Sequence, residues 1–412
     1  MSHVLIIDAV RTPRGRGNDK GALRSITPVD LLAQQFQALV NRTGIDSDQV
    51  SDAIIGCVSQ TSDQGANIAK LALVRAGWSD SVPGLSINRY CASGLSAVHL
   101  AAQQAMASDG LAVGGGVEMM SRVPMAADQG PLTHDFEFQK QTTLVPIGIC
   151  ADTIATQEGI DRAQCDAYAL ASQQRAVAAL TQAKFRSVVP VHDMQGNELL
   201  AQDETPRAQT SLESLSALKP AFAAMGEKFG IDQLMCQRYG LDHIDHVQHA
   251  GNSPAMADGA STVLLASPAA ANRLGLKARA RILATATVSV DRTLALTGSV
   301  QATEKALSLA GLHLDDIDLF EVNESFASLM LHYMKHLNLP HSKVNVNGGA
   351  IALGHAMGST GSALLGMAID ELELRQARRA VVALCGAAGL AVAMVIERIE
   401  SQPLLAHQPH HA

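Results

Sequence analysis

Aromatic residues make up only 3% of this 412-residue chain, with one tryptophan among them. Small and aliphatic side chains must therefore fill most of the core. Cysteine is scarce, and no CxxC pair occurs among Cys57, Cys91, Cys150, Cys165, Cys236 and Cys385. This spacing excludes a zinc ribbon and a small disulfide scaffold. Positive charge is also in deficit, because the formal net charge is -8, which argues against nucleic acid as a general partner.

The chain lacks a hydrophobic run long enough for a membrane span. Its longest apolar stretch covers residues 380–396, whereas a membrane helix usually needs about 20 apolar residues. Gly386 and Gly389 interrupt this stretch, which therefore predicts two buried strands joined by a tight turn. At the N-terminus, the apolar run that ends at Asp8 is too short for a signal peptide. We expect a cytoplasmic protein that does not associate with a membrane.

Strand-like and helix-like segments alternate along the chain. With 47% hydrophobic and 17% charged residues, it has ample apolar material for a large core. Residues 4–10 are strand-like, and Thr27, Pro28 and Asp30 then supply a helix N-cap, a first-turn proline and an early acid before Gly44 ends the helix. Further strands are predicted at 53–58, 85–88, 111–118 and 317–322, and further helices at 67–76 and from residue 93. This alternation predicts an α/β fold.

The chain repeats part of its pattern with a constant offset of 267 residues. The offset joins Gly44 to Gly311, Ile45 to Leu312, Asp48 to Asp315, Val50 to Ile317 and Gly94 to Gly361. We interpret this register as the duplication of one α/β unit. The predicted halves are residues 1–120 together with 249–275, and residues 276–412.

The stretch between the two predicted copies, residues 121–248, has a different character. It is more polar and carries most of the charges in the middle of the chain. Asp161 and Gln164 resemble a capping box, which predicts one helix that runs to about Lys184. We interpret the stretch as an inserted loop domain that acts as a lid or holds a cofactor.

Cys91 lies where a predicted strand is followed by a predicted helix, in the segment Asn88-Arg89-Tyr90-Cys91-Ala92-Ser93-Gly94. A thiol at a helix N-terminus faces the positive end of the helix dipole, which favours the thiolate and hence nucleophilicity. The alternative is a buried structural cysteine. The small residues and the glycine that follow Cys91 favour the nucleophile.

The second copy places a histidine at the matching junction. Residues 345–350 precede Gly354-His355-Ala356-Met357-Gly358, and the repeat makes this the same strand-to-helix junction as that of Cys91. Homologous junctions of a duplicated fold usually meet near a shared pseudo-dyad. His355 is therefore predicted to lie close to Cys91, as the base of an activated thiol. Considered alone, a histidine among glycines is more often a loop residue.

Two further junctions carry polar or reactive side chains. Cys385 lies in the turn predicted within 380–396, and alone it would be a core residue, because free cysteine packs as a small hydrophobe. Asn323 and Glu324 follow the strand predicted at 317–322. This pair could bind water or an oxyanion, or it could cap the next helix.

Four segments together resemble the thiolase family of acyl-CoA acyltransferases, and they occur in that family's order: NRYCASGL (88–95), NESF (323–326), GHAMG (354–358) and CGAAG (385–389). HAGNSPAMADGA (249–260) and GGVEMMS (115–121) resemble two further thiolase stretches. The resemblance implies a duplicated five-layer α/β/α/β/α fold with a loop domain inserted into the first half. It also implies a homodimer or a homotetramer.

The resemblance further implies a ping-pong acyl transfer, either cleavage of a 3-ketoacyl-CoA by CoA or the reverse condensation of acetyl-CoA. Cys91 would take the acyl group, His355 would accept the thiol proton, and Cys385 would exchange a proton with the acetyl methyl carbon or the CoA thiol. Asn323 would hold a water that, with His355, stabilises the enolate oxygen. The backbone N–H groups of Cys91 and Ala387 would form a second oxyanion hole.

Coenzyme A, as co-substrate, would lie along the loop domain. The resemblance implies contacts with Arg207, Ser214, Phe222, Ser253 and Phe326. An arginine suits a phosphate because its planar fork gives bidentate bonds, although a solvated surface arginine is the alternative. Neither a metal nor another cofactor is expected.

Three alanines depart from the family's pattern. Ala356 stands in place of a proline, and Ala387 and Ala388 stand in a turn that is usually rich in glycine, where a positive φ would strain alanine. Extra length at 223–247 is compatible with a longer or bulkier acyl chain. The alternatives to a thiolase are a thiolase-like protein that binds acyl-CoA or lipid without catalysis, and a decarboxylating ketoacyl synthase. The CGxxG setting of Cys385 favours the thiolase.

Overall fold

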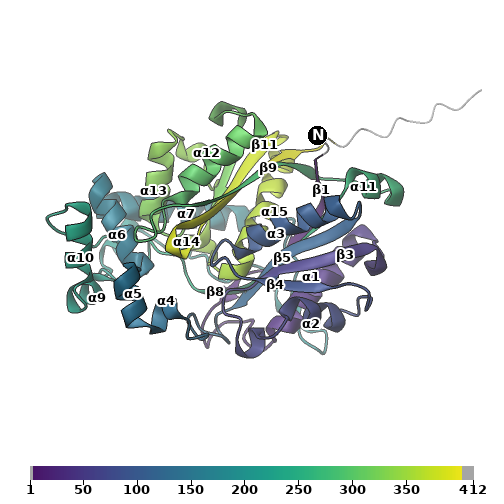
Figure 1. Ribbon diagram of the computed structural model, residues 1–412, viewed down its shortest axis with the longest axis horizontal. Helices are drawn as coiled ribbons and strands as arrows, with labels where there is room; N and C mark the ends of the chain where they lie inside the picture. Colours follow the sequence, from purple (N-terminus) through teal and green to yellow (C-terminus); the bar gives the residue numbers. More distant parts are fainter. Residues whose placement is uncertain (1–2, 401–412) are drawn as a thin grey trace, which may run out of the picture.

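A computed structural model describes residues 3–400 of the chain (Figure 1). The predicted halves extend to residues 1 and 412, so their parts at 1–2 and 401–412 lie outside the described residues. Strands and helices alternate along the chain, which confirms the predicted α/β class.

The main sheet has ten strands in the order β10-β11-β12-β9-β1-β8-β5-β3-β4, with the short strand β2 beside β8. The bounds are β1 Leu5–Arg11, β2 Gly15–Arg16, β3 Val50–Gly56, β4 Gly84–Ile87, β5 Leu111–Met119, β8 Ala257–Ala266, β9 Ala280–Ser289, β10 Leu319–Val322, β11 Arg379–Cys385 and β12 Leu390–Arg398. Two parts of this sheet meet where β1 pairs with β9, through Leu5 with Arg281 and Ile6 with Ala280. β8 lies between β1 and β5, so the chain returns to the first part after residue 256.

Helices complete five layers around the two parts of the sheet. α3 (Ser93–Ala107) and α15 (Met357–Arg375) pack against each other and lie between β5 and β11 in Figure 1. α1 (Pro28–Thr43) and α2 (Ile68–Arg75) cover the outer face of the first part. α12 (Gly298–Ala310) and α13 (Ala327–His336) cover the outer face of the second part. This succession confirms the predicted five-layer α/β/α/β/α arrangement.

Local sequence explains where α1 begins and ends. The hydroxyl of Thr27 accepts a hydrogen bond from the N–H of Asp30 at 3.1 Å, and Pro28 occupies the first turn, where no intrahelical N–H bond is needed. Gly44 ends the helix with a φ of 70°, a left-handed conformation that suits glycine. Leu32 and Phe36 lie on the face buried against the sheet. The helix predicted from these signals is confirmed.

Residues related by the offset of 267 occupy matching places. Gly311 ends α12 with a φ of 67°, as Gly44 ends α1. Gly94 and Gly361 lie where α3 crosses α15. A Cβ atom at Gly94 would come within 2.7 Å of the carbonyl oxygen of Gly358, and one at Gly361 within 2.4 Å of the backbone of α3. Only glycine fits such contacts, so the repeat reflects two equivalent helices in close contact.

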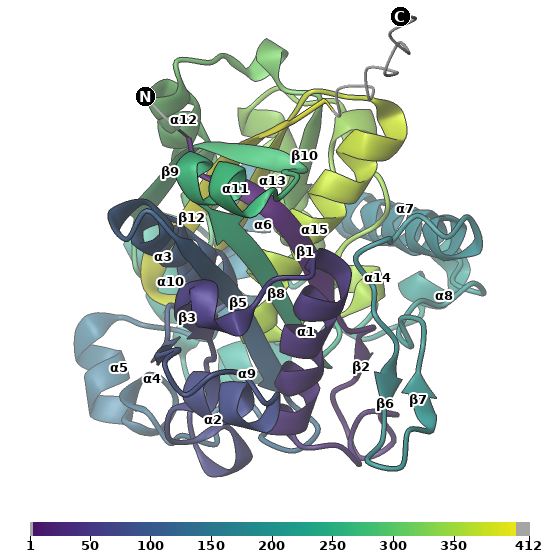
Figure 2. The same cartoon turned by 90° about the vertical axis from the view of Figure 1, so that its right-hand side faces the viewer.

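Residues 121–248 are richer in helix than the sequence predicted. Their elements are α4 Pro131–His134, α5 Phe136–Thr142, α6 Ile147–Glu158, α7 Arg162–Thr181, β6 Val191–His192, β7 Glu198–Leu200, α8 Leu212–Ser216, α9 Ala223–Lys228 and α10 Ile231–Tyr239. The predicted helix is α7, and its capping box of Asp161 and Gln164 is present. α6 escaped prediction because eight successive residues, 148–155, are buried and no polar face marks the helix. In Figure 2 the β6–β7 hairpin lies at the lower right edge of the molecule.

The junction before His355 differs from the prediction, because residues 345–349 do not form a strand. Asn345 has a φ of 46°, which is incompatible with an extended chain. Its side-chain amide instead accepts from the N–H of Val322 and donates to the carbonyl of the same residue, each at 2.8 Å, so a side chain continues the ladder at the end of β10. α14 (Ala350–Leu353) then leads to His355.

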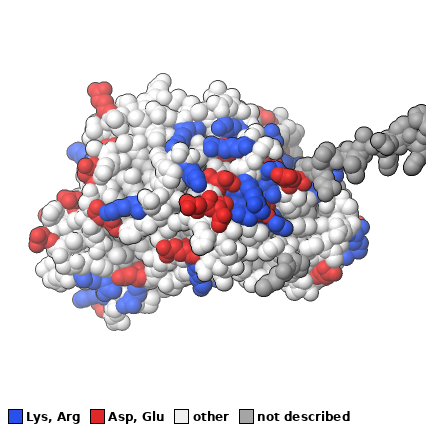
Figure 3. Space-filling view, turned by 90° about the horizontal axis from the view of Figure 1, so that it is seen from above, with Lys and Arg blue, Asp and Glu red and all other residues white. Residues whose placement is uncertain are grey.

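The remaining elements are short. They are the helix α11 Pro268–Leu274 and the 3-10 helices Ser47–Gln49, Ser62–Gln64, Leu314–Asp316, His341–Lys343 and Ala387–Gly389. Basic and acidic side chains are interspersed on the face shown in Figure 3. Among residues 3–400, no helix has both the length and the apolar character that crossing a bilayer requires.

Candidate active site

Cys91 lies between β4 and α3 and is half-buried. Tyr90 before it has a φ of 48°, which turns the chain sharply so that α3 can begin at Ser93. Burial raises the pKa of the Cys91 thiol to about 12, and the nearby sulfur of Cys385 and carboxylate of Glu118 raise this pKa further, against the lowering effect of the N–H of Cys91 itself. Burial thus opposes the effect of the helix N-terminus, which favours the thiolate. A raised pKa favours the thiol form of Cys91, for which a base that accepts the thiol proton is needed.

Cys385 ends β11 and belongs to a short hydrogen-bonded chain. Its Sγ lies 3.1 Å from Oγ of Ser325, and Nδ2 of Asn323 donates to that Oγ at 2.9 Å. Because Asn323 supplies a proton to the hydroxyl oxygen, Ser325 can donate its own proton to the sulfur. Burial raises the pKa of Cys385, and the bond from Ser325 lowers it. Oδ1 of Asn323 is buried and has no hydrogen-bond partner among the described residues.

His355 is buried just before α15. The residue before it, Gly354, has a φ of 85°, so the chain turns sharply between α14 and His355. Nδ1 of the ring lies 2.8 Å from Oγ1 of Thr360, and this hydroxyl donates to the carbonyl of Ala356 at 3.2 Å. Since the hydroxyl of Thr360 gives its single proton to this carbonyl, its Oγ1 can only accept a hydrogen bond from Nδ1–H of the ring. A neutral ring that carries its proton on Nδ1 has an unprotonated Nε2. Nε2 has no partner among residues 3–400. Burial, with Arg14 nearby, lowers the pKa of His355 to about 3, so the ring is neutral and can accept a proton.

Ala356 reaches the conformation expected of the family's proline without that ring. Its φ is -86°, close to the value near -65° that proline imposes. The proline is therefore not needed to place His355 ahead of α15.

The fold brings the two cysteines together and places His355 at the neighbouring helix end. Glu118 links the two helix ends, because its buried carboxylate accepts from the N–H of Gly358 in α15 at 3.0 Å and acts electrostatically on Cys91. On the other side, a Cβ atom at Gly386 would lie 3.3 Å from the carbonyl oxygen of Arg89, so the turn after Cys385 abuts the loop of Cys91. Within the described part of the chain, no hydrogen bond joins the thiol of Cys91 to the ring of His355.

The turn after Cys385 contains the positive φ that the sequence analysis considered. Ala388 has a φ of 56° and a ψ of 29°, whereas Ala387 is not in the left-handed region. Strain from a Cβ atom therefore falls on Ala388. Ala387, whose N–H is the candidate oxyanion donor, is free of it.

Replacing Ala388 by glycine is expected to raise the free energy of unfolding by about 0.5–1 kcal/mol, because relief of left-handed strain exceeds the extra backbone entropy that glycine loses. Ala387→Gly is the matched control, and it should lower the same free energy by a similar amount because no strain is relieved. Urea denaturation followed by circular dichroism measures both. If Ala388→Gly lowers the free energy of unfolding as much as Ala387→Gly does, the backbone of Ala388 is not strained.

Three of the five predicted CoA contacts cluster, and two lie on an exposed segment. The rings of Phe222 and Phe326 meet edge to face, with centroids 6.0 Å apart. The N–H of Ala327 donates to the carbonyl of Asn252 at 3.0 Å, which sets Phe326 beside Ser253. Oγ of Ser253 is buried without a partner among residues 3–400.

Arg207 and Ser214 are both exposed. Ser214 is engaged in a capping box with Ser211 at the start of α8, and no side-chain bond of Arg207 is formed within the described residues. Phe326 is buried in the same apolar cluster as Cys385, and Phe222 packs against that cluster. The two rings therefore connect the predicted CoA contacts to the reactive sulfur.

Comparison with known proteins decides the family. The model of the thiolase N-terminal domain matches residues 4–228, and that of the thiolase C-terminal domain matches residues 276–398. The chain is 37% identical to the 3-ketoacyl-CoA thiolase of Aliivibrio fischeri over 413 residues, covering 97% of this chain and all of that protein. The chain belongs to the thiolase family. The 3-ketoacyl-CoA thiolase of Serratia proteamaculans is also 37% identical, over 414 residues and with the same coverage.

The fold is similar to that of a solved thiolase relative. The crystal structure of the Bacillus anthracis acetyl-CoA acetyltransferase superposes with a TM-score of 0.84 at 32% identity, covering 97% of this chain and 99% of that one.

Two buried carboxylates shape this thiolase site; sequence reasoning missed Glu118 and left the role of Glu324 open. Besides Gly358, Glu118 accepts from the N–H groups of Val58 and Ser59, at 2.9 and 3.1 Å. Glu324 accepts from the hydroxyl of Tyr168 at 2.8 Å and from the N–H of Ile351 at 3.0 Å, and so ties the end of β10 to α7 and α14. A signal was present, because both lie in segments that resemble the family, GGVEMMS and NESF. Both are positioning residues.

Proposed function

We propose that this thiolase cleaves 3-ketoacyl-CoA by CoA, or runs the reverse condensation of acetyl-CoA, through an acyl group carried on Cys91. The observation that carries the proposal is that Cys91 and Cys385 share one site at the start of α3: the turn after Cys385 abuts the loop of Cys91, and the sulfur of Cys385 raises the pKa of the Cys91 thiol. The relatives named 3-ketoacyl-CoA thiolase support this substrate class.

In the first half-reaction, Sγ of Cys91 attacks the 3-keto carbon while Nε2 of His355 takes the thiol proton. The bond between C2 and C3 then breaks, and Cys385 protonates C2, so that acetyl-CoA leaves and the acyl group stays on Cys91. In the second half, the thiolate of Cys385 takes the proton of the CoA thiol, whose sulfur attacks the acyl carbon. Cys91 leaves as thiolate and regains its proton from His355.

Two groups of donors would stabilise the developing negative charge. We assign the N–H groups of Cys91 and Ala387 to the oxygen of the acyl carbon. The unpartnered Oδ1 of Asn323 would hold a water that acts with His355 on the enolate oxygen.

CoA would lie along residues 121–248, which we propose as the loop domain between halves formed by 1–120 with 249–275 and by 276–412. Phe222, Ser253 and Phe326 would contact the pantetheine end, since they lie beside the apolar cluster of Cys385. Arg207 and Ser214 would meet the nucleotide end, where an exposed guanidinium suits phosphate. Light scattering on the purified protein would measure the predicted homodimer or homotetramer.

We further propose that the substrate carries a longer or bulkier acyl chain than acetoacetyl-CoA does. His246 lies in the extra segment 223–247 and is within hydrogen-bond distance of Asp152 in α6 (2.8 Å) and Asp232 in α10 (3.1 Å). α6 also contributes to the cluster of Cys385, so the extra segment supports the wall of the site. Turnover that is much higher with acetoacetyl-CoA than with medium or long 3-ketoacyl-CoAs would remove this part.

Cys385→Ala tests the proposal by separating its steps. Thiolysis, followed as loss of the 3-ketoacyl-CoA enolate absorbance, should fall by at least about 100-fold, because proton transfer to and from carbon has lost its acid and base. Acetylation of Cys91 by acetyl-CoA, followed by intact mass, should still occur, since CoA can leave as a thiolate. Wild type is assayed across acyl lengths in parallel.

Other functions predict other results. A non-catalytic acyl-CoA or lipid-binding protein would show neither thiolysis nor an acetyl adduct in wild type. A decarboxylating synthase would release CO₂ from a malonyl thioester and would tolerate Cys385→Ala. Either outcome would overturn the assignment.

A further inference from the structure

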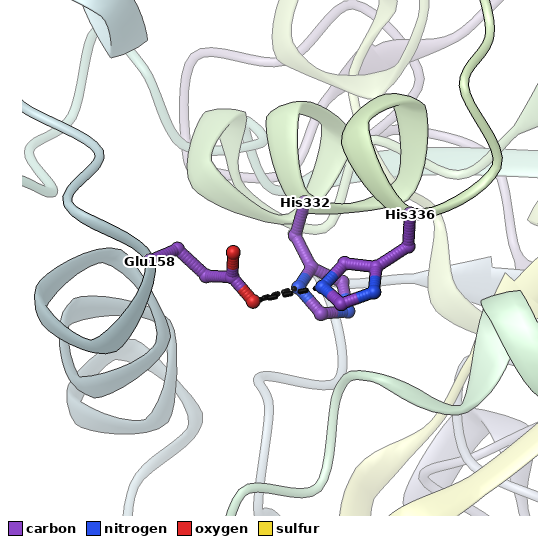
Figure 4. Close-up of side chains that lie close together, drawn as sticks. All are labelled: Glu158, His332 and His336. Atoms are coloured by element: carbon purple, nitrogen blue, oxygen red, sulfur yellow. Dashed lines mark hydrogen bonds and ion pairs between the residues drawn. The ribbon is translucent and has the colours of Figure 1, made fainter.

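Three side chains converge away from the active site, between the C-terminal ends of α6 and α13. Glu158 ends α6, and His332 and His336 lie one turn apart on α13 (Figure 4). Oε1 of Glu158 lies 3.2 Å from Nδ1 of His332 and 2.8 Å from Nε2 of His336. One potential ligand atom of each residue lies within 4.8 Å of the others. Figure 4 shows the carboxylate facing both rings.

The residue types and the exposure of this cluster suit a metal ion. Imidazole nitrogens and a carboxylate oxygen are common metal ligands. His332 is buried, Glu158 is half-buried and His336 is exposed, so an ion can reach the cluster from solvent.

We propose that Glu158, His332 and His336 bind a divalent transition-metal ion of the Zn²⁺ type, with water completing the coordination. Two imidazoles and one carboxylate oxygen are ligands that Zn²⁺ accepts, and this set leaves one tetrahedral position for water. Residues four apart on a helix share one face, and here the ring centroids lie 4.2 Å apart. On binding, the ring nitrogens that now face Oε1 give up their protons, to the other nitrogen of the same ring or to solvent, and present lone pairs to the ion.

This set of residues was not predicted from the sequence. The spacing of His332 and His336 is a metal-ligand spacing, but their carboxylate partner lies 174 residues earlier in the chain. Only the contact between α6 and α13 brings the three together.

The position of the site indicates what the ion does. Cys150 near the start of α6 and Phe326 at the start of α13 belong to the cluster that contains Cys385. An ion at the far ends would therefore clamp together two helices that pack beside the active site. It would act on stability rather than on the reacting atoms.

Lys335 provides an internal test, because its Nζ lies 2.5 Å from Oε2 of Glu158. This cation neutralises the carboxylate and repels an incoming ion. Lys335→Gln should therefore bind the metal more tightly than the parent protein. A structural role for the cluster without metal would not produce this effect.

Calorimetric titration with Zn²⁺ near neutral pH tests the site in the full-length chain. All proteins carry His407→Ala, His410→Ala and His411→Ala, since these histidines lie outside the described residues and could bind metal themselves. The exposed ligand is removed in His336→Ala, which should bind one equivalent less, or bind at least about tenfold more weakly. His243→Ala is the matched control, because His243 is exposed and faces a single carboxylate, that of Asp245, at 3.2 Å.

Two further readouts separate this site from adventitious binding. Co²⁺ bound to the parent protein should give visible absorption bands that His336→Ala lacks, and Zn²⁺ should raise the melting temperature of the parent but not of His336→Ala. His332→Ala should behave like His336→Ala if it folds, but His336→Ala decides the question, since removal of an exposed side chain leaves the core intact. Equal stoichiometry and affinity in the parent and in His336→Ala would overturn the proposal. Zn²⁺ bound at Cys91 or Cys385 would persist in every variant and would not mimic the expected difference.

Discussion

Cys91→Ala is expected to lower kcat for thiolysis by at least about 10⁴-fold, the scale of loss when a covalent nucleophile is removed from an enzyme that relies on it. The reason is structural as well as chemical. Cys385 also lies in the site, but its sulfur is buried and engaged with Ser325 at 3.1 Å, so it cannot take over as the acyl carrier. Brief incubation with acetyl-CoA and intact-mass measurement should show an acetyl adduct on wild type that Cys91→Ala lacks.

Cys165→Ala is the matched control for this loss. Burial raises the pKa of the Cys165 thiol to about 12, as it does for Cys91, but Cys165 lies on α7 within an apolar cluster. The control should keep both the activity and the acetyl adduct. An adduct of unchanged yield in Cys91→Ala, or equal activity in the two variants, would place the acyl group on another residue.

Local signals in the sequence predicted most of the elements that position the site. The cap of α1, the capping box of α7 and the glycine-interrupted pair β11 and β12 all depend on residues within a few positions of each other. Such patterns are readable because the physical cause lies in the same segment. The duplication was readable for a related reason, since Gly94 and Gly361 are required by one close helix crossing.

The failures come from interactions between distant segments. The side chain of Asn345 bonds to the backbone of Val322, and no strand forms at residues 345–349. α6 is buried on so many sides that its sequence lacks the apolar stripe of an amphipathic helix. The environment of the Cys91 thiol depends on distant segments for the same reason. A helix N-terminus near Cys91 is visible in sequence, whereas its burial and the approach of Glu118 and Cys385 are not.

His355→Ala is expected to lower kcat by about 10²–10⁴-fold, the usual contribution of a general base. The pH dependence should reveal why. In wild type, burial holds the pKa of His355 at about 3 and that of Cys91 at about 12, so neither residue changes its protonation between about pH 5 and 9 in the free enzyme. The ionisation of these two residues should therefore leave kcat/KM independent of pH over this range.

Without the imidazole, the reaction must wait for the small fraction of Cys91 that is already thiolate. That fraction grows about tenfold per pH unit below the thiol pKa, so kcat/KM of His355→Ala should rise steeply with pH where wild type stays flat. His341→Gln is the matched control, because burial and Arg175 lower the pKa of His341 to about 4 while its ring stacks on Tyr168, away from the thiols. A flat profile in His355→Ala would mean that ionisation of Cys91 does not limit the reaction and would contradict the role of His355 as base. A bell-shaped profile in wild type that is lost in His355→Ala would mean that Cys91 and His355 form a thiolate–imidazolium pair at rest, and that burial does not set the protonation of this site.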